Sequence, residues 1–79
     1  MNEDLQCLVQ ELLNTGMSLS QVNSFLLLIW QYISQGSVGS IDDQLANTNN
    51  SQYVEAWSTY DEQIMALDIN NLNWYVNPH

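Results

Sequence analysis

The stretch Ser18-Leu-Ser-Gln-Val-Asn-Ser-Phe-Leu-Leu-Leu-Ile-Trp-Gln-Tyr-Ile-Ser-Gln-Gly36 decides the fold. It begins with Ser18 and Gln21 at the spacing of a capping box, and it ends on Gly36, a residue type that commonly follows helix C-termini. Its apolar residues recur on one helical face: Val22, Phe25, Leu26, Ile29 and Ile33. The spacing predicts a helix over residues 18–35.

Further apolar residues cover most of the remaining circumference of this helix: Leu27, Leu28, Trp30 and Tyr32. A helix that is apolar nearly all round is central and buried, or it turns half of its surface toward a partner. A chain of 79 residues has little material to cover both sides. We therefore expect self-association through Leu28 and Trp30.

A second amphipathic helix is predicted on the N-terminal side, over residues 3–15. Asn2 is a good N-cap, Glu3 and Asp4 suit the first turn, and Gly16 suits the end. Its apolar stripe consists of Leu5, Leu8, Val9, Leu12 and Leu13. Cys7 lies beside this stripe and is expected to be a half-buried small hydrophobe.

On the C-terminal side, residues 36–40 form a flexible joint. Ser40 and Asp43 have capping-box spacing, so a short helix over 41–46 is predicted. A helix over 51–67 follows from the spacing of Tyr53, Trp57 and Tyr60 with later apolar residues, and these three rings are expected in the core. The tail, residues 68–79, is either one or two helical turns or an extended aromatic segment. The chain is therefore predicted to be all-α, a small single-domain bundle of three to five helices.

Charge excludes several classes of ligand. The chain has nine acids and no lysine or arginine, which gives a net charge of −9. It cannot hold nucleic acid, a phosphorylated ligand or an anionic membrane by charge. Its apolar runs are too short to span a bilayer, and its first residues lack the positive charge of a signal peptide. We expect a cytoplasmic protein, in the host cytoplasm if a phage encodes it.

The sequence favours neither catalysis nor a metal or cofactor site. The single histidine, His79, follows Pro78 in the tail, where a base is hard to orient, and the serines have no histidine close by to activate them. Asp42-Asp43 and Asp61-Glu62 are neighbouring pairs without the pattern of a calcium loop. We therefore predict no catalytic residue, no metal ligand and no cofactor.

Two features point to protein binding. Six of the nine acids follow residue 40, and they form either an anionic binding face or an ordinary solvated one: Asp42, Asp43, Glu55, Asp61, Glu62 and Asp68. Trp74 and Tyr75 lie among asparagines in the tail, where burial is harder to achieve. Because these ring types are enriched at interface hot spots, we consider them candidate anchors for a partner or a second copy.

Small size, helical pattern, absence of bases and a negative field are similar to those of several inhibitor classes. These include phage anti-CRISPR and anti-restriction proteins that imitate nucleic acid, and immunity proteins or antitoxins that neutralise basic nucleases. The resemblance rests on bulk charge, and no motif carries it. It implies a non-catalytic inhibitor that covers a basic nucleic-acid-binding surface of an enzyme or effector complex, anti-CRISPR-like as a first interpretation. The alternative is a helical homo-oligomeric adaptor without mimicry.

Overall fold

The computed structural model describes residues 3–78. The elements in this range follow one another as α1 (Glu3–Asn14), α2 (Leu19–Ser34), the 3-10 turn η1 (Val38–Ser40), α3 (Ile41–Asn47), α4 (Ser51–Met65) and α5 (Ile69–Val76). None of residues 3–78 lies in a strand, so the prediction of an all-α fold is confirmed. In the tail, the helical alternative is the one observed.

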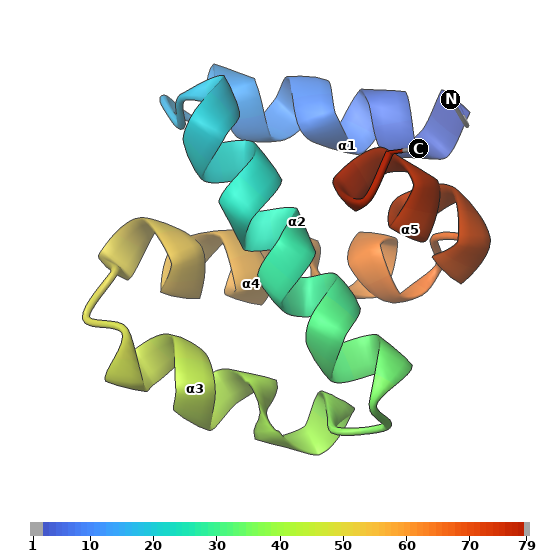
Figure 1. The fold of residues 1–79 in the computed structure, drawn as a ribbon. Coiled ribbons are helices and arrows are strands. Elements are labelled where there is room, and N and C mark those ends of the chain that lie inside the picture. The colour runs from blue at the N-terminus through green and yellow to red at the C-terminus, as the bar shows by residue number, and fades with distance from the viewer. Residues whose placement is uncertain (1–2, 79) are drawn as a thin grey trace.

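Helix α2 is the central element. It crosses in front of α4, with α1 at its beginning and α5 packed beside it (Figure 1). Val22, Phe25, Leu26 and Ile29 have no exposed surface, and burial of each such side chain contributes about 1.5–3 kcal/mol. The all-round apolar character of α2 thus reflects neighbours on several sides.

The core draws on every α-helix. Its buried apolar residues are Leu5, Leu8, Val9, Leu12, Met17, Val22, Phe25, Leu26, Ile29, Ile41, Leu45, Ala56, Ile64 and Leu72. Tyr53, Trp57 and Tyr60 are half-buried and pack against this cluster. The ring of Tyr53 lies 5.4 Å from that of Phe25 at 45°, and its hydroxyl donates to the Gln21 carbonyl at 3.4 Å. These contacts join α4 to the first half of α2.

The predicted start and end of α2 are confirmed. The Ser18 hydroxyl oxygen accepts from the Gln21 backbone N–H at 3.1 Å, and the Ser18 N–H donates to Gln21 Oε1 at 2.8 Å. Gly36 follows the helix with φ of 73°, a left-handed conformation that glycine adopts without a steric penalty.

The predicted capping box between Ser40 and Asp43 is wrong. Ser40 ends the 3-10 turn with φ −101° and ψ 2°, and its side chain caps nothing ahead of it. Its hydroxyl instead donates to the Ser37 carbonyl at 2.8 Å. Because the 3-10 turn runs directly into α3, Ser40 lacks the extended backbone that lets an N-cap side chain reach the next turn.

The expectation for Cys7 is also wrong, because Cys7 is exposed. It follows buried Leu5 by two residues, which is about 200° around a helix and therefore opposite the apolar stripe. Asn2, the predicted cap of the first helix, and His79 lie outside the described residues. Within residues 3–78, no helix combines the length and the apolar character needed to cross a membrane.

Candidate functional site

Most of the predicted acidic residues lie on the helical hairpin formed by α3 and α4. The two helices pack against each other and run in opposite directions (Figure 1). Asp42 and Asp43 are exposed in the first turn of α3, where the helix dipole favours negative charge. Glu55 and Glu62 are exposed on one face of α4, two turns and about 10 Å apart. No lysine or arginine exists in the chain to neutralise these four carboxylates.

The other two predicted acids have local backbone contacts. Asp61 is half-buried, and its Oδ1 accepts the Glu62 backbone N–H at 2.8 Å. Asp68 is the N-cap of α5. Its side chain accepts from the Asn70 backbone N–H at 2.9 Å and from the Asn71 side-chain amide at 3.4 Å. Its role as the N-cap of α5 thus explains Asp68 without any need for a binding partner.

The structure separates the two candidate aromatic anchors. Trp74 is 58% exposed, whereas Tyr75 is half-buried and its hydroxyl donates to Oδ1 of Asn23 on α2. Neighbouring residues point about 100° apart on a helix, and here Tyr75 packs against the core while Trp74 is exposed, so only Trp74 is freely available to a partner. Burial raises the pKa of the Tyr75 phenol above its ordinary value. Helices α3 and α5 lie at opposite ends of the molecule (Figure 1), so Trp74 does not join the acids of α3 in one patch.

The residues expected to mediate self-association are largely covered. Leu28 and Trp30 are half-buried and pack against the core. Among residues 3–78, the exposed large apolar side chains are instead Leu19, Val54, Met65, Ile69 and Trp74. Of these, sequence analysis singled out Trp74 as a candidate anchor; Leu19, Val54, Met65 and Ile69 were not identified as exposed.

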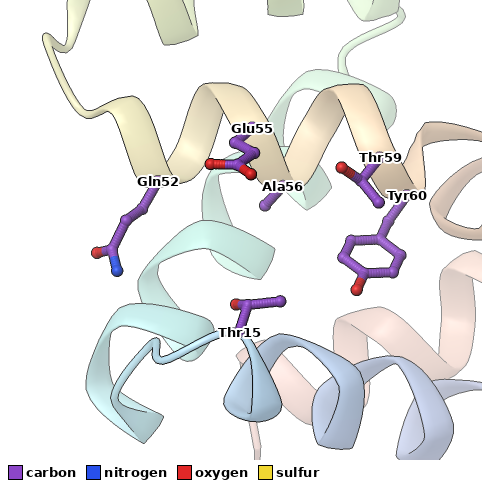
Figure 2. A pocket seen from close by; sticks show the side chains of 6 residues that line it. All are labelled: Thr15, Gln52, Glu55, Ala56, Thr59 and Tyr60. Carbon is purple, nitrogen blue, oxygen red and sulfur yellow. The ribbon is translucent and has the colours of Figure 1, made fainter.

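A cleft of about 190 Å³ lies between the end of α1 and one side of α4. Figure 2 shows its lining side chains: Thr15 from the end of α1, and Gln52, Glu55, Ala56, Thr59 and Tyr60 from α4. Thr15 directly follows the last residue of α1, and Ala56 is the one buried member of the set. Of these residues, sequence analysis singled out only Glu55 as a site residue. The four other residues from α4 lie on the same helical face as Glu55 by their spacing, whereas Thr15 joins them through the packing of α1 against α4, which no sequence spacing encodes.

Hydrogen bonds fix part of the cleft wall. The Thr15 hydroxyl donates to the Leu12 carbonyl at 2.6 Å, so its remaining capacity is as an acceptor. Gln52 Oε1 accepts from the Gln21 side-chain amide at 3.3 Å, which ties the rim to α2. The cleft therefore combines one carboxylate, hydroxyl oxygens and an aromatic ring, in a chain that has no lysine or arginine.

Across residues 3–78, no group of three or more His, Cys, Asp or Glu side chains gathers as a metal site would require. Comparisons with protein-family models, with curated proteins and with solved structures found no match for this chain. The functional proposal therefore rests on the chain's own residues.

Proposed function

We propose that this chain is a non-catalytic inhibitor that covers a basic nucleic-acid-binding surface of an enzyme or effector complex, in the manner of an anti-CRISPR protein. The observation that carries the proposal is that Asp42, Asp43, Glu55 and Glu62 are all exposed on the α3–α4 hairpin, in a chain that has no lysine or arginine to neutralise them. In a chain without lysine or arginine, any lysine or arginine that pairs with these four carboxylates comes from another molecule. A basic protein that handles nucleic acid supplies such cations in a dense array.

The physical mechanism is competition for the same basic surface. The net charge of −9 speeds encounter with a positive patch, and short-range contacts then set the residence time. Trp74, exposed on α5, is available as a contact outside the acidic hairpin. Occupation of the basic surface excludes nucleic acid without any chemical step.

The test uses a purified basic nuclease or RNA-guided effector that the immobilised chain retains from host lysate. Its association rate is measured by surface plasmon resonance from low to high NaCl, with and without competing duplex DNA. We expect the rate to fall by about tenfold or more across the salt series, and DNA to compete. Binding that is independent of salt, or unaffected by DNA, contradicts the proposal.

Matched variants locate the surface. Asp43→Lys with Glu62→Lys reverses two exposed charges on the hairpin, whereas Glu3→Lys with Glu11→Lys makes the same net change on α1. We expect the hairpin variant to associate at least several-fold more slowly than the α1 variant. Circular dichroism checks that both are folded. Equal slowing by both variants would show that net charge alone acts, without a defined face.

A homo-oligomeric adaptor is the second candidate, favoured by exposed apolar side chains where α4 meets α5. Met65 and Ile69 are 46% and 36% exposed, and Trp74 on α5 is also exposed. Light scattering should then show a concentration-dependent dimer that Trp74→Asp disrupts. Trp74 is a better position for this test than Leu28 or Trp30, because those two side chains also pack against the core. A strict monomer at high concentration would contradict the adaptor function.

A further inference from the structure

We propose that the cleft between the end of α1 and helix α4 receives the guanidinium group of a single arginine side chain. The inference rests on the proposed function, because the basic partner supplies that arginine. It assigns one defined site within a surface that otherwise acts through its overall charge.

The carboxylate of Glu55 is the main attraction for a cation. Figure 2 shows it on the α4 side of the cleft, across from Thr15. A carboxylate and a guanidinium form two parallel charge-assisted hydrogen bonds, which add direction to the attraction. No lysine or arginine of this chain competes for Glu55, since the sequence has neither.

The end of α1 adds a second negative contribution from the opposite wall. A helix C-terminus carries a partial negative charge, and cations are stabilised beside its last turn. The last turn of α1 contains no basic residue, and Thr15, which follows it directly, lines the cleft. Glu55 and the end of α1 therefore favour a cation from two sides.

The uncharged lining also suits a flat donor with several N–H groups. The Thr15 hydroxyl has donated its hydrogen to the Leu12 carbonyl, so its oxygen can accept from a ligand. The half-buried ring of Tyr60 borders the same space, and an aromatic face attracts a cation placed over it. Arginine combines both requirements, because its planar guanidinium carries five donors and stacks on aromatic rings.

Size restricts the occupant to one side chain. The volume of about 190 Å³ is below the roughly 300–1,000 Å³ of pockets for drug-sized ligands. An anionic or phosphorylated ligand would meet Glu55 without any cation to offset the repulsion. A single extended arginine side chain fits the volume of the cleft, and its positive charge is opposite to that of Glu55.

The experiment titrates the full chain with N-acetyl-arginine amide and follows backbone amide shifts by NMR. N-acetyl-citrulline amide is the uncharged control of nearly the same shape, and N-acetyl-lysine amide tests whether any cation suffices. We expect saturable shifts at Thr15, Ala56 and Thr59 with the arginine compound, weaker binding of the lysine compound and none of the citrulline compound. No saturable shift at these residues, equal shifts with citrulline, or tighter binding of lysine overturns the assignment.

Glu55→Gln and Glu62→Gln provide the matched pair of variants. Both remove one exposed charge from the same face of α4, but only Glu55 lines the cleft. We expect Glu55→Gln to weaken binding of the arginine compound about tenfold and Glu62→Gln to change it less than twofold. Equal weakening by both would show that diffuse charge, not the cleft, binds the ligand. If the arginine compound does not bind as expected but partner association remains salt-dependent, only the cleft assignment is wrong. If partner association is independent of salt, the proposed function itself is wrong.

Discussion

At the scale of single residues, Asp68 shows how an acid in an acidic chain can be kept for a local structural reason. Its side chain accepts the Asn70 backbone N–H at the start of α5. Replacing such a cap with alanine costs about 1 kcal/mol of stability. We therefore predict that Asp68→Ala lowers the free energy of unfolding by about 1 kcal/mol, measured by urea denaturation.

Asp68→Asn is the control for this prediction, because asparagine caps helices about as well as aspartate and removes the charge. We expect the asparagine variant to lie within a few tenths of a kcal/mol of the native chain. If Asp68→Asn is as unstable as Asp68→Ala, the negative charge at this helix N-terminus matters more than the cap.

Residue-scale prediction from the sequence succeeds where the signal is local. Ser18 and Gln21 form their capping box because both partners belong to the turn that they stabilise. Ser40 has the same spacing to Asp43 but is the last residue of a 3-10 turn, so its backbone is not extended and the cap does not form. Both sites have the same spacing between the serine and its partner three residues later. The backbone conformation at the serine decides whether the cap forms.

At the scale of elements, the contact between α5 and α2 includes one polar link. The Tyr75 hydroxyl donates to Asn23 Oδ1, far away in the sequence. Because Asn23 is exposed and water can replace the lost donor, we predict that Tyr75→Phe lowers the free energy of unfolding by about 0.5–1 kcal/mol at neutral pH. Urea denaturation measures the loss, and amide hydrogen exchange should show faster opening of α5 than of α1.

The same phenol gives the stability a pH dependence. Burial raises the pKa of Tyr75 above its ordinary value of 10.0. The unfolded chain therefore loses this proton first as pH rises, so the folded state binds more protons and the free energy of unfolding falls above about pH 10. Well below that pH both states keep the proton and the contribution is constant. Tyr75→Phe should remove this part of the alkaline decline, and an equally steep decline in the variant would contradict it.

Elements with regular apolar spacing were predictable, whereas their mutual placement was not. The spacing in α1 and α2 reflects burial within each helix, so Leu8, Leu12 and Phe25 were identifiable as core. The tail has a weaker pattern, because its eight-residue helix buries only Leu72 completely. The cleft depends on how α1 meets α4, which brings Thr15 beside residues about forty positions later. Glu55 was therefore identified as an acid of the surface and not as part of a cleft.

At the scale of the whole molecule, the dominant feature is negative charge spread over a small protein. The radius of gyration is 11.6 Å. At about 20 mM salt the Debye length is roughly 20 Å, so acids on different helices repel one another across the molecule. At about 200 mM it is roughly 7 Å, shorter than the molecular radius, and most of this repulsion is screened. The fold has no cationic side chain from lysine or arginine to offset it.

We therefore predict that NaCl raised from about 20 to 200 mM increases Tm, measured by circular dichroism. Relief of about 1 kcal/mol of repulsion corresponds to roughly 4–8 °C in a domain of this size. The triple variant Asp43→Asn, Glu55→Gln, Glu62→Gln removes three exposed negative charges and should show a smaller increase. It should also start from a higher Tm at low salt, because fewer charges repel. A Tm that stays constant or falls with salt, or an equal rise in the triple variant, would show that self-repulsion does not limit the stability of this chain.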